Sequence, residues 1–134
     1  MIDADLAFRV TVTESADGRA TVVHLKDAFL NYSFADQLKR NLKEILKERL
    51  GAGQRRFVVD LSAVNVMDSC GLSVLIGLKK LVETEGGRLH LVAVSPMILR
   101  LFSITRLDRV FEIHATEGDA TLALDAAPAP APDA

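Results

Sequence analysis

A chain of 134 residues, 49% of them hydrophobic, is long enough for one domain that buries roughly two thirds of its unfolded surface. With no tryptophan and one tyrosine, its core must be aliphatic, with phenylalanine as the main aromatic residue. The net charge of −2, with both signs interspersed, argues against a nucleic-acid groove, and no apolar run approaches the roughly 20 residues that span a bilayer. Because acids stand near the N-terminus where a signal peptide has basic residues, we expect a cytoplasmic protein.

The first third of the chain predicts two strands and a helix. Residues 8–13 and 21–25 alternate between polar and apolar side chains, and the Asp17-Gly18 pair between them is a strong signal for a hairpin turn. Residues 30–50 then change to a helical period, with an apolar stripe on one side and charges on the other. We therefore expect an antiparallel hairpin followed by a helix.

The rest of the chain predicts strands that alternate with helices. The β-branched run before Leu61 suits a strand that is covered on both faces, and the apolar residues after Ser69 continue long enough for a helix. The expected strands are residues 56–61, 89–94 and 110–114, and the expected helices are residues 69–84, 95–104 and 116–124. This order predicts an α/β single domain, with a mixed, mostly parallel sheet opened by an antiparallel hairpin and about four helices.

The last ten residues have a different composition. Residues 125–134 are rich in alanine and spaced prolines, which prevent regular structure other than extended polyproline II. We therefore expect the domain to cover residues 1–124, with residues 125–134 as a mobile tail.

The most informative motif is the junction at Asp68-Ser69, where a predicted buried strand leads into a helix whose first turn presents a hydroxyl. Helix starts prefer both residue types, so from spacing alone Ser69 is more often a plain N-cap, and Asp68 is either the cap itself, which we favour, or an acidic neighbour that helps to position the serine hydroxyl. The free N–H groups and the positive dipole end of a helix also suit an oxyanion, so we expect the backbone to accommodate a phosphate on Ser69. Both interpretations of Ser69 stay open at this point.

Other residue types that carry chemistry give weaker signals. His24, His90 and His114 fall on separate predicted strands, which favours edge or surface positions over a cluster, and their spacing matches no zinc site. Cys70 could be a nucleophile at a helix start, but no arginine follows it at phosphatase-loop spacing and no histidine is near it in sequence. We therefore expect no metal, no cofactor and no enzymatic activity.

The strand before Leu61, the Asp68-Ser69-Cys70-Gly71-Leu72 turn and the later Ser95-Pro96 pair together resemble the STAS domain family of bacterial anti-sigma factor antagonists. The similarity runs from about residue 8 to about residue 124. It implies that Ser69 is phosphorylated by a partner kinase that doubles as an anti-sigma factor, with Asp68 and Gly71 supporting the phosphosite. Unphosphorylated protein would bind the kinase and free the sigma factor, and a serine phosphatase acting on phospho-Ser69 would restore binding.

The resemblance also implies a partner-facing surface. It consists of loop and helix residues: Asp27, Asn31, Tyr32, Leu72 and Ile76. The chain departs from the family's pattern at Cys70, where a second Ser or Thr is common, and in the loop at residues 26–31. These differences leave an alternative function, a constitutive STAS accessory subunit of an ABC-type lipid transport system, which needs no phosphorylation.

Overall fold

The computed structural model describes residues 10–15, 18–26, 29–30 and 35–126. Its elements in chain order are β1 (Val10–Glu14), β2 (Thr21–Leu25), β3 (Phe29–Leu30), α1 (Ala35–Gly51), β4 (Arg56–Asp60), β5 (Val66–Met67), α2 (Ser69–Thr84), β6 (Arg88–Val92), α3 (Pro96–Ile104), the 3-10 turn η1 (Leu107–Arg109), β7 (Ile113–His114) and α4 (Glu117–Ala126).

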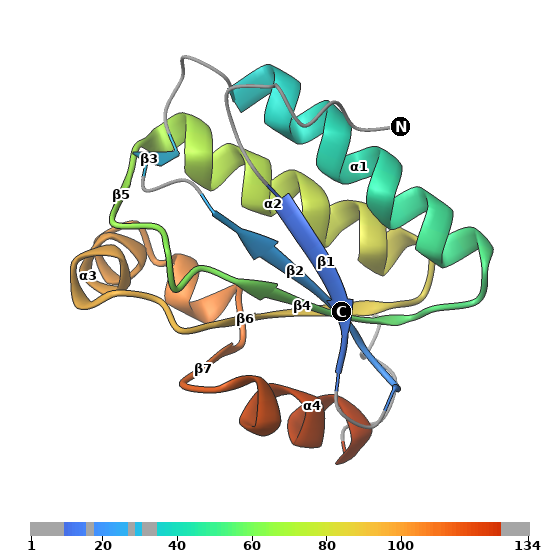
Figure 1. The fold of residues 1–134 in the computed structure, drawn as a ribbon. Helices are drawn as coiled ribbons and strands as arrows, with labels where there is room; N and C mark the ends of the chain where they lie inside the picture. The colour runs from blue at the N-terminus through green and yellow to red at the C-terminus, as the bar shows by residue number, and fades with distance from the viewer. Residues whose placement is uncertain (1–9, 16–17, 27–28, 31–34, 127–134) are drawn as a thin grey trace.

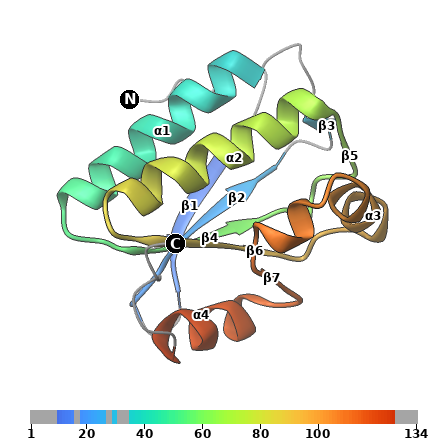
Figure 2. The same ribbon diagram turned by 180° about the vertical axis from the view of Figure 1, so that it is seen from behind.

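Five strands form the main sheet in the order β1-β2-β4-β6-β7. β1 and β2 are antiparallel, and every other neighbouring pair in this sheet is parallel. Helices α1 and α2 cover one face of the sheet, α4 lies against the other face, and α3 sits at one end (Figure 1; Figure 2 shows the same layers from behind). The predicted fold class, a mixed and mostly parallel sheet with an opening hairpin and four helices, is confirmed.

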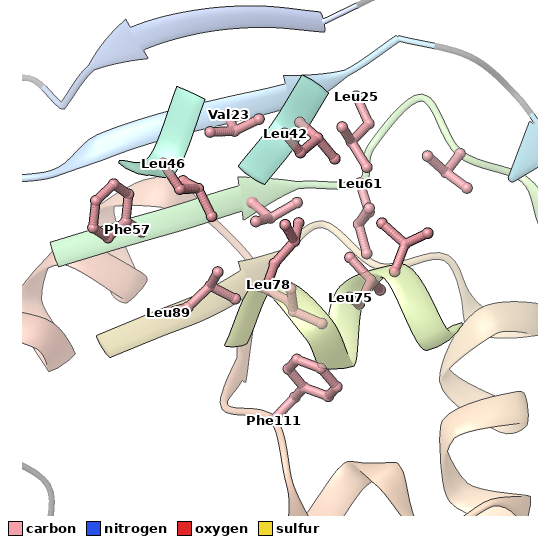
Figure 3. Packing of buried hydrophobic residues seen from close by; sticks show 14 of the residues in the cluster. Val23, Leu25, Leu42, Leu46, Phe57, Leu61, Leu75, Leu78, Leu89 and Phe111 are labelled. Atoms are coloured by element: carbon pink, nitrogen blue, oxygen red, sulfur yellow. The ribbon is translucent and has the colours of Figure 1, made fainter. Parts of the chain in front are cut away.

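The core has a large and a small part because the central strands are buried on both faces. The large part fills the space between the sheet and the α1–α2 layer (Figure 3), where leucine side chains such as Leu42 and Leu78 meet Phe57 and Leu89. The smaller part lies under α4 and consists of Ala20, Val22, Val58, Val92, Ala120 and Leu124. The predicted aliphatic core is therefore present, and α4 is held by a thinner apolar contact than α1 and α2.

The segment before α1 differs from the prediction. The helix expected over residues 30–50 begins at Ala35, and residues 29–30 instead form β3, which pairs in parallel with β5 in a separate two-stranded sheet. Two-residue strands contain too little alternation for a sequence pattern to show them.

The C-terminal elements also differ in their bounds. The strand expected over residues 110–114 is only Ile113–His114, because the chain first makes the 3-10 turn η1, which Arg106 enters with a left-handed φ of 64°. Helix α4 continues to Ala126, two residues into the expected tail, and residues 127–134 lie outside the described residues.

Candidate functional site

The first turn of α2 is capped by the carboxylate of Asp68. Asp68 has an extended backbone (φ −105°, ψ −173°), and its Oδ1 accepts the N–H groups of Cys70 at 2.9 Å and Gly71 at 3.1 Å. Aspartate is among the residues preferred at this position, because its side chain satisfies N–H groups that have no partner within the helix. Asp68 is therefore the N-cap.

Ser69 is the first residue of α2, and its side chain is exposed. Within the described ranges its hydroxyl has no hydrogen-bond partner. The interpretation of Ser69 as a plain N-cap is thus wrong, since its neighbour does the capping. Among the residues that the structure describes, none gives the Ser69 hydroxyl a structural role, and its side chain is exposed.

The backbone does not offer the open anion site that the sequence suggested. The N–H groups of Cys70 and Gly71 are already bound by Asp68, so a phosphate on Ser69 would stand beside a carboxylate rather than on free donors. The positive end of the helix dipole still favours negative charge here, whereas the charge of Asp68 opposes it.

The other predicted site residues differ in whether the structure describes them and in how exposed they are. Leu72 is 6% exposed and belongs to the core, so it offers no surface to a partner. Ile76 is half-buried and packs against that core, and Gly71 is buried. The loop residues Asp27, Asn31 and Tyr32 lie outside the described residues.

An apolar groove lies between β5 and α3. Its volume is about 250 Å³, and it is lined by Asn65, Val66, Met67, Met97, Ile98, Arg100, Leu101 and Ile104. Several of these side chains are unusually exposed for their type: 43% for Val66, 67% for Met97 and 73% for Ile104. β5 contacts both α2 and α3, and it lies at the end of the domain where α2 begins (Figure 1). Because Ser69 is the first residue of α2, the β5–α3 groove is at the same end of the domain as Ser69.

Helix α3 forms one side of the groove. The side chain of Ser95 accepts the N–H of Ile98 and caps α3, and Pro96 occupies the first turn. The helix then buries Ile98 and Phe102, which are four residues apart on one face, and leaves Met97 and Ile104 outside. Met97 and Ile104 also repeat at a helical spacing, so the sequence alone does not show which of the two apolar faces meets the core.

A polar network crosses the sheet on the α4 face. Nδ1 of His24 in β2 lies 2.7 Å from Oδ2 of Asp60 in β4, and Nε2 of His24 lies 2.9 Å from Oγ1 of Thr13. Burial alone would raise the pKa of Asp60, but hydrogen bonds from Ser62 and His24, together with the charge of His24, hold that pKa below its usual value. The side chain of His24 therefore connects β2 with its two neighbours in the sheet, β1 and β4.

Two of the histidines form a cluster, contrary to the sequence expectation. The rings of His90 and His114 stack with centroids 5.1 Å apart, and Oε1 of Glu112 lies 3.9 Å from Nε2 of His114. His90 is only 3% exposed, and this burial, with the charge of His114, lowers its pKa to about 4. The expectation failed because parallel pairing of β6 with β7 brings together residues that are 24 positions apart in the chain.

Residues 9–120 match the sequence model of the STAS domain. The chain belongs to the STAS domain family. A similar protein, the anti-sigma-B factor antagonist of Bacillus subtilis, is 39% identical over 77 residues, which cover 53% of this chain and 68% of that protein.

Solved structures show the same STAS fold. An anti-sigma-factor antagonist (STAS) domain protein from Planctomyces limnophilus has a TM-score of 0.76 at 23% identity, with 87% of this chain and 98% of that chain covered. The Bacillus cell fate determinant SpoIIAA in its phosphorylated form has a TM-score of 0.59 at 20% identity, with 86% and 96% covered. In this STAS domain, no helix among the described residues is long and apolar enough to cross a membrane.

Proposed function

We propose that this STAS domain is an anti-sigma factor antagonist, an interaction module that binds an anti-sigma factor kinase while Ser69 is unphosphorylated and so releases the sigma factor. The observation that supports the proposal most directly is that two different residues cap helix α2 and present the hydroxyl at its start. Asp68 caps the helix, and Ser69 presents an exposed hydroxyl with no described partner. A kinase can reach such a hydroxyl without unfolding the helix.

The relatives support the same function. The Bacillus subtilis protein is named an anti-sigma-B factor antagonist, and the SpoIIAA structure of the same fold is of a phosphorylated form. The alternative role in lipid transport has no comparable support from the site, because it gives the exposed Ser69 hydroxyl nothing to do.

The β5–α3 groove gives the proposed kinase a surface to bind. Exposed apolar side chains gathered in a hollow are typical of protein interaction sites, and Val66, Met97 and Ile104 provide them at the end of the domain where α2 begins. Arg100 at the groove adds a positive charge that suits an acidic group on the partner.

Phosphorylation would act at the interface rather than on the fold. A phosphate adds about −1.5 to −2 charge, here next to the carboxylate of Asp68. Burying two adjacent negative groups against a partner costs desolvation and repels acidic partner groups, while the cap contacts to Cys70 and Gly71 stay in place. A phosphatase that removes the phosphate would restore binding, and the cycle would run in the cytoplasm with the kinase and the sigma factor.

The test measures binding to an anti-sigma factor kinase of the histidine-kinase-like ATPase fold from the same genome. By titration calorimetry, Ser69→Ala should bind like the wild type and resist phosphorylation. Ser69→Asp should bind at least about 30-fold more weakly, since like charges juxtaposed at an interface cost several kcal/mol. The matched control is Thr84→Asp, which adds the same charge at the exposed far end of α2 and should leave affinity unchanged.

Equal binding by Ser69→Ala and Ser69→Asp would refute the switch. Co-purification with an ABC transporter ATPase, unaffected by Ser69→Asp, would instead favour the constitutive subunit.

A further inference from the structure

Three side chains that can coordinate a metal ion meet on the α4 face of the sheet. The register of β6 and β7 pairs Val92 with His114. Because side chains of a strand alternate between the two faces, His90 and Glu112, each two residues earlier in the chain, fall on the same face as His114. The three residues therefore converge although their sequence spacing shows no metal motif.

The distances between their ligand atoms fit a shared ion. Nδ1 of His90 lies 3.2 Å from Nε2 of His114, and the ligand atoms of all three residues lie within 4.8 Å of one another. Two imidazole nitrogens bound to one tetrahedral zinc ion at about 2.0–2.1 Å are about 3.3 Å apart. The histidine pair is thus already spaced for an ion, and the Glu112 carboxylate at 3.9 Å from Nε2 of His114 needs only a small rotation.

The cluster combines one buried side chain with two more exposed ones, and this arrangement suits the binding of a metal ion from solvent. His90 is only 3% exposed, so its ring is fixed in the interior of the domain. The side chains of His114 and Glu112 are 19% and 62% exposed, so an ion and a water ligand can reach the cluster from solvent.

A second cluster of possible metal ligands lies on the same face, but it is less suited to bind an ion. His24, Asp60 and Glu117 also bring their ligand atoms within 4.8 Å of one another. Both ring nitrogens of His24 are already engaged, however, by Asp60 at 2.7 Å and by Thr13 at 2.9 Å. An ion could therefore bind His24 only by displacing one of these two contacts.

We propose that His90, His114 and Glu112 bind a divalent transition-metal ion such as Zn²⁺, with water completing the coordination. Two histidines, one carboxylate and an open position form a known ligand set for such ions. The ion would tie the two-residue edge strand β7 to β6, next to the thin apolar contact that holds α4. This site is independent of the proposed switch at Ser69.

The experiment titrates the full chain, made without a histidine tag and stripped of metal by a chelator, with ZnCl₂ at neutral pH. Calorimetry should show one ion per chain. Loss of even an outer-shell partner weakens metal sites by about 10–100-fold, so His114→Ala should weaken binding at least that much, and Glu112→Gln should weaken it in the same direction. Circular dichroism shows whether each variant is folded, and His90 is left unchanged because it is buried.

The matched control is His24→Ala, which removes a histidine from the neighbouring cluster and should keep wild-type affinity. Imidazole NMR signals of His90 and His114, but not of His24, should shift on addition of Zn²⁺. The proposal is overturned if the wild type takes up no Zn²⁺ at millimolar concentration, as a simple hydrogen bond between the two imidazoles predicts. It is also overturned if folded His114→Ala binds like the wild type, or if only His24→Ala loses binding.

Discussion

Oδ1 of Asp68 accepts the backbone N–H of Cys70 at 2.9 Å, and the residue between them in the chain carries the exposed hydroxyl. Capping and the proposed modification are thus assigned to adjacent side chains. A change of charge at Ser69 therefore leaves the cap contacts intact, and loss of the cap leaves the hydroxyl accessible. The two functions can be separated by substitution.

Replacing Asp68 with alanine should destabilise the domain. Loss of an N-cap typically costs about 1 kcal/mol, within a range of about 0.5–2 kcal/mol, because N–H groups such as those of Cys70 and Gly71 lose their acceptor. Asp68→Asn keeps a capping oxygen and should retain most of the stability. Urea unfolding measures the difference, and Ser69→Ala serves as the control, with an expected change within about 0.5 kcal/mol. A larger loss in Ser69→Ala than in Asp68→Ala would contradict the assignment of the cap.

The charges at Asp68 and position 69 should be coupled. Negative charge in the first turn of a helix is worth about 0.3–1 kcal/mol, but next to the Asp68 carboxylate this gain is offset by repulsion. Ser69→Glu alone should therefore change the free energy of unfolding little, whereas in an Asp68→Asn background it should stabilise the domain. A double-mutant cycle in low salt measures the coupling. Identical effects of Ser69→Glu on the free energy of unfolding in both backgrounds would show that the Asp68 carboxylate does not interact with the charge at position 69.

The strands and helices that the sequence predicted well are those with a sustained period. The hairpin strands, the strand at 56–61 and the helix after Asp68 all appear close to the expected positions, because each has enough residues to repeat its pattern. β3, β5 and β7 have two residues each, and tertiary pairing rather than local pattern determines where they form.

The sequence shows where helix α2 begins, but it does not show the clusters and exposed side chains that strand register and helix packing create. Ser69 and Asp68 were identified because helix starts have a residue code that a sequence displays directly. The cluster of His90 with His114 depends on strand register, and the exposure of Met97 and Ile104 depends on which helix face meets the core, so neither follows from spacing along the chain.

Adding a side chain at Gly87 should destabilise the domain. A Cβ at this position would lie 2.7 Å from the carbonyl oxygen of Arg55 and 2.8 Å from Cγ1 of Val82. The same carbonyl oxygen accepts the N–H of Arg88 at 2.8 Å, where β6 joins β4. Because the nearest atom belongs to the backbone, Gly87→Ala should cost about 1–3 kcal/mol, as overpacking does. Gly51→Ala is the control, since a Cβ there meets no atom within 4 Å. Urea unfolding compares the two variants, and equal stability would refute the steric argument.

Burial of neutral His90 should make the domain less stable in mild acid. Its pKa is about 4 in the folded state against an ordinary histidine value of 6.5, so between these values the unfolded chain binds more protons than the folded one. Stability should therefore fall as pH decreases through this window, by as much as about 3 kcal/mol, and the loss should level off below about pH 4. The charges around His90 belong to His114, Arg88 and Lys79, which lower its pKa, and to Glu112, which raises it.

The measurement is urea unfolding at a series of pH values in the presence of a chelator, for the wild type and for His90→Gln. Glutamine does not titrate, so the variant should show a flatter dependence on pH above about 4 even if its overall stability is lower. Asp60 acts in a separate window, because its lowered pKa adds stability that is present above 3.8 and lost only at lower pH. An unchanged slope in His90→Gln would mean that another group carries the acid sensitivity.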